Sequence, residues 1–441
     1  MIARSLVMAA AVLAAWQPAY AQAVAGAPPI ALAELERLAL DNNPTTRAAQ
    51  AARDAAAARA RQAGMWPNPI VGYSGEEITR RGAVDPRGEH GFFVEQTIVL
   101  GGKLRLSREV FERAAEQAEA RIDLQRQRIL TSVRSLYYEL LTAERRVEVY
   151  DRLAALGMEA VGVTAQLFNV GAADRPDFLE MEIEARRVQL ELNAGRNDVY
   201  ALRQRLAAVV GRADVAGRPL AGAIDEAIPE LERASTIRGL VEESPQIRAA
   251  RAEVARSRAV TARARREAYP NLFVRGGAAF NRELGEIARQ PIGWEGQVEA
   301  GISIPLFNRN QGGVAAARAD ETRVEADLRR LELSLLAQGA VEFARYLTAL
   351  RSAESYRAEI LPRAEQAYAL YLARYREMAA AYPQVLVAQR TLFDMSVRYL
   401  ASLEDAWRSA LRLQGTLPGD GLQPVEAGMN EGGSDAYTAG E

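Results

Sequence analysis

Several residue types are missing or rare in this chain, and each absence excludes a kind of chemistry. Cysteine is absent, so neither disulfide bonds nor a lipid anchor attached through cysteine is available. Histidine occurs once, at His90, in a segment predicted to be a loop between strands, so a cysteine–histidine nucleophile pair or an ordinary zinc site cannot form. The LGGK motif, which contains the only lysine, Lys103, lacks the spacing of a phosphate-binding loop. We therefore expect no enzyme and no cofactor.

Charge excess and long apolar runs are also missing. The formal net charge is -2 at pH 7, which leaves no basic excess to neutralise phosphates, so nucleic acid is not an expected partner. Beyond the N-terminal segment, no window holds the roughly 18 uninterrupted apolar residues of a membrane helix. If the protein spans a membrane, it must do so with strands.

The N-terminus has the pattern of a cleaved secretory signal over residues 1–21. Arg4 precedes an apolar run at residues 6–16, and a small-x-small pattern ends at Ala21. Cleavage is expected after Ala21, with cleavage after Ala23 as the alternative. The mature protein is therefore expected to leave the cytoplasm.

The chain contains two copies of one plan. NNPTTRAAQAARDAAAARARQAGMWPNP at residues 42–69 matches ESPQIRAARAEVARSRAVTARARREAYP at residues 243–270. Later matches keep nearly the same register, so most of the length difference falls between Pro69 and Leu100, where loops are expected. The predicted parts are a first repeat at 30–215, a second repeat at 235–418 and a disordered tail at 419–441.

Each repeat is predicted to run from a helix through two strands into a very long helical stretch. The four strands are expected at about residues 70–78, 91–100, 271–281 and 293–305. Their length of roughly 9 to 11 residues and their alternation fit strands of a transmembrane barrel. A half-buried hairpin of a soluble protein is the alternative.

The long helices are predicted from proline-free apolar stripes. Between Gly102 and Asn169, apolar residues recur at three-, four- and seven-residue steps, as in coiled-coil packing: Leu130, Val133, Tyr137, Leu140, Val147 and Tyr150. The stripe predicted for the second repeat consists of Leu336, Ala340, Phe343, Leu347 and Leu350. Such a helix, on the order of 100 Å long, fits a periplasmic span better than a compact enzyme.

Both long helical stretches are expected to turn back at a helical tip, at about residues 168–177 and 375–384. Gly171 permits a left-handed backbone at a helix end. Pro176 and Pro383 fit the first turn of the helix that follows.

This combination resembles the outer-membrane efflux protein (TolC) family, over roughly residues 30–418. FFVEQTIVLGGKLRLSREV at residues 92–110 resembles the heavy-metal-efflux branch, the CzcC/CusC-like proteins. The resemblance implies a mainly α fold with a small β part, in which a trimeric α-helical barrel forms a periplasmic tunnel continuous with a shared 12-stranded outer-membrane β-barrel. Four strands leave open edges, so two, three or four chains could close a barrel; the resemblance selects three.

The function implied by this resemblance is that of an exit duct in the outer membrane of a Gram-negative bacterium. It would passively conduct heavy-metal cations as part of a tripartite efflux pump. The implied partners are two further copies in a homotrimer, a periplasmic adaptor protein, a proton-driven inner-membrane RND transporter and outer-membrane lipid. A duct of the same fold for drugs or type I protein secretion is one alternative, and a soluble periplasmic coiled-coil scaffold or adaptor is another.

In such a barrel, the alternation of IGWEGQVEAGISI, which begins at Ile292, would separate lipid from water. The residues expected to face lipid are Trp294, Val298, Ala300, Ile302 and Ile304. The residues expected to face a water-filled lumen are Glu295, Gln297 and Glu299.

In similar proteins carboxylates ring the constriction at the helical tips. Carried over to this chain, the gate candidates are Asp177 and Glu180, whereas Gln384 and Val387 stand where the family often has aspartates. A ring of Asp177 side chains would attract cations, but Asp177 could instead simply favour the N-terminus of its helix. The tip residues expected to contact the adaptor are Val170, Gly171, Ala172, Met378 and Ala379.

Overall fold

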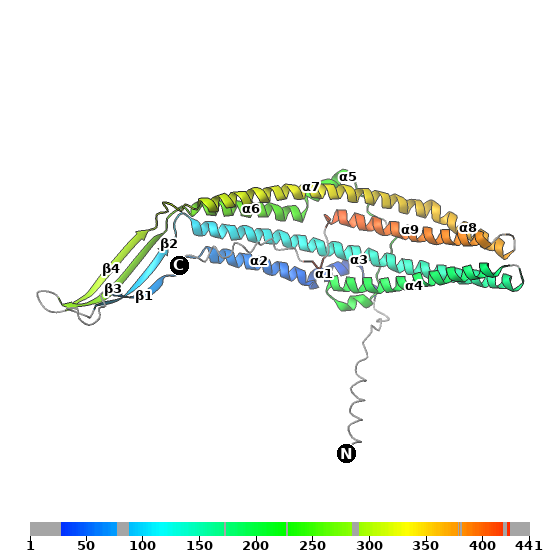
Figure 1. Ribbon diagram of the computed structural model, residues 1–441, viewed down its shortest axis with the longest axis horizontal. Helices are drawn as coiled ribbons and strands as arrows, with labels where there is room; N and C mark the ends of the chain where they lie inside the picture. Colours follow the sequence, from blue (N-terminus) through cyan, green and yellow to red (C-terminus); the bar gives the residue numbers. More distant parts are fainter. Residues whose placement is uncertain are drawn as a thin grey trace, which may run out of the picture. The chain divides into compact units, whose positions relative to one another are not determined.

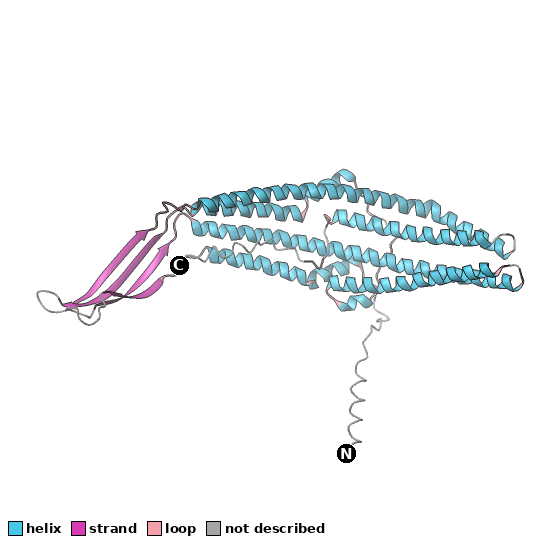
Figure 2. Cartoon of the chain, viewed as in Figure 1, coloured by secondary structure: helices cyan, strands magenta, loops and turns pink. Residues whose placement is uncertain are grey.

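The computed structural model of the chain is mainly helical, with one small antiparallel sheet (Figures 1 and 2). It describes residues 28–76, 88–171, 173–225, 228–284, 291–377, 379, 382–417 and 421–423. The predicted signal segment, nearly all of the predicted tail, and the tip residues Ala172 and Met378 lie outside these ranges.

The elements follow the same order in both halves of the chain: two helices, two strands and long helices. The first half consists of α1 (Leu32–Asn42), α2 (Pro44–Ala63), β1 (Ile70–Glu76), β2 (Glu89–Ile98), α3 (Lys103–Asn169) and α4 (Arg175–Val210). After the short 3-10 helix Ala213–Gly217, the second half consists of α5 (Arg233–Glu242), α6 (Pro245–Arg266), β3 (Leu272–Leu284), β4 (Pro291–Ile302), α7 (Gln311–Ser355), the π-helix Tyr356–Ile360, α8 (Leu361–Arg376) and α9 (Tyr382–Gln414).

Helix α3 is a single helix of 67 residues, on the order of 100 Å long. The predicted stripe lies on its packed side. Val133, Tyr137, Leu140 and Tyr150 are buried, and Leu130 and Val147 are half-buried. The three- and four-residue spacing therefore identified the face of α3 that packs into the core.

The second half differs from the prediction in two ways. Only part of the predicted stripe is packed: Phe343 is buried, Leu347 and Leu350 are half-buried, and Leu336 and Ala340 are exposed. The buried side chains on this part of α7 belong to Leu335, Phe343, Tyr346, Ala349 and Ala353. Tyr346 selects this face: it is 1% exposed and its hydroxyl donates to the carbonyl of Pro229 at 2.7 Å. The long stretch is also interrupted by a π-helix just before Pro362, whose ring nitrogen cannot donate a helix hydrogen bond.

Two compact units can be distinguished, and each draws on both halves of the chain. One contains residues 28–47, 125–242 and 335–423, and the other contains Ala48–Leu124 and Glu243–Ser334. In the first unit, Tyr138 stacks on Trp407 with ring centroids 3.7 Å apart. The indole nitrogen of Trp407 donates to the carbonyl of Ile224 at 3.1 Å, so this core joins α3 and α9 to the segment after α4.

The second unit contains the whole sheet, in the order β1-β2-β3-β4 with every pair antiparallel. Strands β2 and β3 form the central pair, so the hairpin of each half joins the hairpin of the other. Strand β4 ends at Ile302, and Ile304 therefore lies beyond the strand in which it was expected.

Candidate functional site: the strand faces and the helix turns

The register of the sheet gathers apolar side chains on one face. Residues directly opposite each other on neighbouring strands point to the same side. Val71, Val94, Gly276 and Val298 form one such row, and Tyr73, Phe92, Ala278 and Gly296 form the next. Trp294, Ala300 and Ile302 of β4 point to this same face. The exposed fractions of Val71, Phe92, Trp294 and Val298 are 73%, 68%, 71% and 85%.

The opposite face of the sheet is mainly polar, with Ile70, Phe93 and Phe273 as its large apolar side chains. Glu95, Arg275 and Glu299 form one row across β2, β3 and β4, and Gln297 and Glu295 follow on β4. The amide of Asn281 donates to Glu295 at 3.5 Å on this face. The register therefore brings Glu295, Gln297 and Glu299 to one face of β4, and Trp294, Val298, Ala300 and Ile302 to the other.

His90 does not lie in a loop, contrary to the sequence prediction. It belongs to β2, where it is half-buried and opposite Gly75, and its ring stacks on Tyr73. The Tyr73 hydroxyl and the Nδ1 atom of His90 also share a hydrogen bond. Strand β2 begins earlier than expected because these paired residues extend the ladder with β1 and β3 to Glu89.

The LGGK motif forms the connection from β2 to α3. The side chain of Lys103 is 5% exposed; its ammonium group donates to Oδ1 of Asn271 at 3.0 Å and lies 3.6 Å from a carboxylate oxygen of Glu267. Gly101 and Gly102 have φ values of 73° and 72°, a left-handed backbone that favours glycine. The sequence did not predict this role, because the partner of Lys103, Asn271, lies 168 residues away in the chain.

The first helix turn lies between α3 and α4. Gly171 has φ 74°, as expected of a residue that ends a helix. Val170, beside it, is 74% exposed. Asp177 is half-buried in the first turn of α4, and Glu180 follows three residues later on the exposed surface. The two gate candidates thus lie on one side of α4, next to the turn.

The second helix turn lies between α8 and α9. Ala379 is exposed, and its backbone N–H donates to the carbonyl of Arg374 at 2.8 Å. Contacts to α3 hold α8 just before this turn: the hydroxyl of Tyr375 donates to Thr164 at 3.4 Å, and Arg376 pairs with Glu159.

A buried carboxylate near the turns was not predicted. The side chain of Glu184 on α4 is 3% exposed and is bound by Arg187 at 2.5 Å and by Arg390 of α9 at 3.2 Å. Burial raises its pKa, but the hydrogen bonds and charges of the two arginines outweigh this, so the pKa of Glu184 lies below its usual range. In the sequence, Glu184 and Arg187 look like an ordinary surface pair three residues apart.

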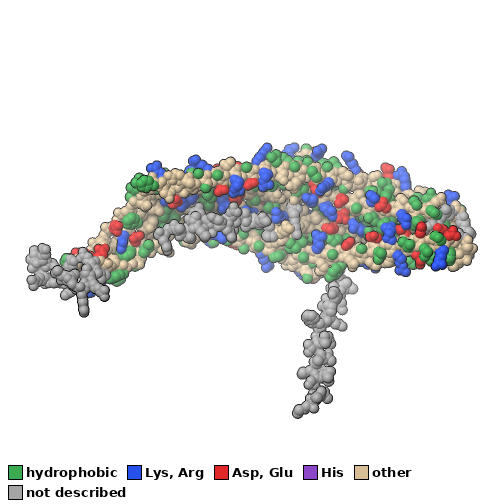
Figure 3. Space-filling model, viewed as in Figure 1, with side chains coloured by type: hydrophobic (Ala, Val, Ile, Leu, Met, Phe, Trp, Pro, Cys, Tyr) green, Lys and Arg blue, Asp and Glu red, His purple; other side chains and the backbone are tan. Residues whose placement is uncertain are grey.

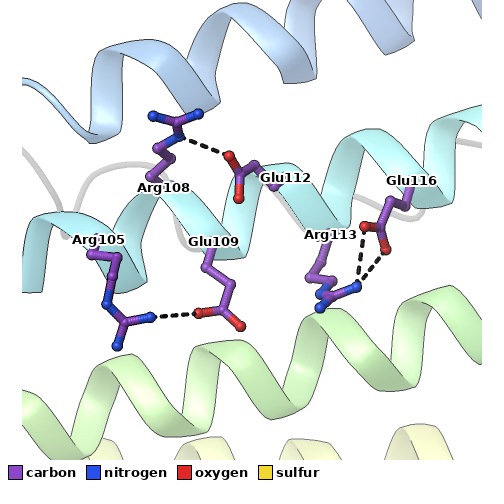
Figure 4. A pocket seen from close by; sticks show the side chains of 6 residues that line it. All are labelled: Arg105, Arg108, Glu109, Glu112, Arg113 and Glu116. Carbon is purple, nitrogen blue, oxygen red and sulfur yellow. Dashed lines mark hydrogen bonds and ion pairs between the residues drawn. The ribbon is translucent and has the colours of Figure 1, made fainter.

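Elsewhere on the helices, basic and acidic side chains are intermixed on the surface (Figure 3). A hollow of about 340 Å³ on α3 is lined by such side chains, as Figure 4 shows. Its pairs are Arg105 with Glu109, Arg108 with Glu112, and Arg113 with Glu116. Because each charge has a partner within four residues, the hollow has the character of a solvated helix face.

The described residues contain neither a cluster of metal ligands nor a membrane-spanning helix. Within these ranges, no three His, Cys, Asp or Glu side chains gather closely enough to hold a metal ion. Among the described helices, none has the combination of length and apolar character needed to cross a membrane.

Comparison with known proteins confirms the resemblance. The chain shares 27% identity over 398 residues with the cobalt-zinc-cadmium resistance protein CzcC of Cupriavidus metallidurans, over 89% of this chain and 90% of that protein. It shares 27% identity over 329 residues with the nickel-cobalt-cadmium resistance protein NccC of Alcaligenes xylosoxydans xylosoxydans, over 72% and 70% of the two chains.

The predicted mainly α fold with a small β part is also confirmed, whereas the trimer and the 12-stranded barrel stay predictions. The structure of the outer-membrane channel OprN aligns with a TM-score of 0.75 and 20% identity, over 92% of this chain and 97% of that one. The family described as outer membrane efflux protein matches residues 35–212 and 236–417. This match favours an efflux protein of the outer membrane over a soluble scaffold. The chain belongs to the outer membrane efflux protein family.

Proposed function

We propose that the chain is the passive exit duct of a tripartite efflux pump and that its cargo is heavy-metal cations. The sheet is the observation that carries this proposal. Its apolar face leaves Phe92, Trp294 and Val298 each more than two-thirds exposed, while its other face is mainly polar and carries the charged side chains of the row Glu95, Arg275 and Glu299. A sheet of this kind is stabilised when lipid covers the apolar face and water the polar face.

Three copies would complete the duct. Strands β1 and β4 are the two edges of the sheet, and edge strands carry unpaired backbone groups that a neighbouring chain can pair. Four strands from each of three copies would close a 12-stranded barrel. On α4, Leu179, Ile183 and Leu190 are 46%, 66% and 70% exposed and fall on one stripe, which supports a second contact between copies along the helices.

The helix turns supply the gate and the docking surface. Asp177 and Glu180 would form the carboxylate ring of the gate. A periplasmic adaptor would contact Val170, Gly171 and Ala379, together with Ala172 and Met378, and would connect the duct to a proton-driven RND transporter. The choice of cargo rests on CzcC and NccC, whose names record resistance to cobalt, zinc, cadmium and nickel.

Metal accumulation in cells tests this function. The gene is deleted in its own host, and cell-associated cobalt, zinc, cadmium and nickel are measured by mass spectrometry alongside a panel of drugs. We expect the deletion strain to accumulate metal and the wild-type gene to restore efflux. Drug accumulation alone would overturn the metal cargo while keeping the duct, and no change in either would overturn the proposed function.

Two matched variants test the assignment of the strand faces in the same cells. Val298→Asp places a carboxylate on the apolar face, and Gln297→Asp places one on the polar face of the same strand. We expect Val298→Asp to abolish complementation, because a charge facing hydrocarbon is costly, and Gln297→Asp to complement. Equal behaviour of the two variants would contradict this assignment.

A further inference from the structure

The polar face of the sheet carries one basic side chain among acidic ones. Within the paired residues of the four strands, this base is Arg275. The carboxylates on the same face are those of Glu76, Glu89, Glu95, Glu295 and Glu299. Arg275 lies directly opposite both Glu95 and Glu299, so these three residues form one charged row across the sheet.

The guanidinium of Arg275 is held against the sheet by an aromatic ring. Its Cζ atom lies 3.6 Å from the ring centroid of Phe93, in a cation–π contact. The cross-strand partner of Phe93 is Gly72, and a Cβ atom at that position would collide with the ring. Glycine thus leaves room for the Phe93 ring, and Phe93 in turn holds the positive charge of Arg275.

We propose that Arg275 is a specificity-determining residue of the duct, because it limits how strongly this part of the lumen prefers cations over anions. This inference rests on the proposed function, in which the polar face lines a water-filled lumen. Two carboxylates and one guanidinium give the row a formal charge of -1 in each chain, and loss of Arg275 would make it -2.

The row acts on a passing ion as a unit. Arg275 is the cross-strand neighbour of both Glu95 and Glu299, and Cβ atoms of such neighbours lie about 5 Å apart. That distance is shorter than the screening length of about 8 Å at physiological ionic strength. One additional negative charge at about 7 Å in water changes the Boltzmann weight of a monovalent cation by roughly two- to threefold. Arg275 therefore has a measurable effect on selectivity without blocking either kind of ion.

Reversal potentials in planar bilayers under a KCl gradient test this inference. The purified full-length mature protein is compared with Arg275→Gln, Arg275→Lys and Glu299→Gln. We expect Arg275→Gln to raise the ratio of potassium to chloride permeability roughly four- to ninefold, because the added negative charge favours the cation and disfavours the anion by roughly two- to threefold each, and Glu299→Gln to lower the ratio by a similar factor. Arg275→Lys keeps the charge and should stay near the wild-type ratio, which separates an effect of charge from an effect of folding.

Arg309→Gln is the matched control, because it removes the same charge from an exposed position between β4 and α7. It should leave the ratio unchanged. A conducting wild-type channel whose selectivity is indifferent to Arg275→Gln would overturn this inference and leave the proposed function standing. A pure protein that never forms a channel would overturn both.

Discussion

The carboxylate of Glu184 ties α4 to α9 through Arg390, and its ionisation links that contact to pH. Burial opposes the charged form, but Arg187 and Arg390 together hold the pKa below its usual range. A carboxyl group whose folded-state pKa is depressed stabilises the fold above its unfolded-state pKa. That contribution is lost as the pH falls through the folded-state value.

We predict that Glu184→Gln lowers the free energy of unfolding at pH 7 by about 1–3 kcal/mol, because the amide has one accepting oxygen and no charge, and so cannot replace the carboxylate that accepts from both Arg187 and Arg390. The variant should also lose less stability than the wild type as the pH falls below about 4, the ordinary range of glutamate. Thermal unfolding in detergent, followed by circular dichroism at several pH values, measures both effects.

Glu182→Gln is the control for this prediction, since Glu182 is exposed on the same helix two residues away. It should change neither the stability at pH 7 nor its pH dependence by a comparable amount. If the two variants behave alike, Glu184 does not provide the proposed link between α4 and α9.

At the residue scale, the sequence predicted which face of a strand a side chain lies on better than it predicted which residues that side chain contacts. Alternation along residues 292–304 correctly separated Trp294 and Val298 from Glu295 and Glu299 on the two faces of β4. The pairing of Arg275 with Phe93 depends on the register between β2 and β3, which no local pattern contains. The burial of Lys103 likewise depends on Asn271, 168 residues away in the chain.

At the scale of elements, the connection from β2 to α3 depends on two glycines with different surroundings. Gly101 lies against Tyr269: a Cβ atom at Gly101 would lie 2.7 Å from the Cβ atom of Tyr269. An added Cβ at Gly102 would meet nothing within 4 Å. Both glycines have a left-handed backbone, so the pair separates the cost of backbone strain from the cost of crowding.

We predict that Gly102→Ala costs about 1–2 kcal/mol, which is the strain of placing alanine in a left-handed conformation. Gly101→Ala should cost about 1–3 kcal/mol more, because Tyr269 must also move. Thermal unfolding of the two variants in detergent gives the difference. Equal losses would show that Tyr269 yields freely and does not fix the position of the strands on α3.

The helices were predicted best where their packing is regular. The stripe on α3 consists of aliphatic and aromatic residues at regular three-, four- and seven-residue steps, and these residues are buried or half-buried in the structure. On α7 the buried face is chosen by Tyr346, which finds a backbone partner at Pro229, rather than by the larger number of aliphatic residues one position away. Pro362 was visible in the sequence, but its consequence, a π-helix before α8, depends on how the chain accommodates a missing donor.

At the scale of the whole molecule, duplication explains why one sheet and two helix turns arise from a single chain. Each repeat contributes a hairpin of strands, and β2 and β3 join them. The duplication is not symmetric in charge. The first turn carries Asp177 and Glu180, and the exposed residues at the corresponding place in the second are Gln384 and Val387. A carboxylate gate would therefore be formed by the first repeat alone.

We predict that combining Asp177→Asn with Glu180→Gln changes the single-channel behaviour of the purified protein. The wild type should show a small, cation-selective conductance, because the negative charges at a narrow constriction attract cations. The double variant should conduct more, lose selectivity, or both. Glu191→Gln combined with Asp198→Asn removes the same charges from exposed positions on α4 farther from the turn, and should behave as the wild type. A conductance indifferent to the first pair would place the constriction elsewhere and leave Asp177 the simpler role of stabilising the N-terminus of α4.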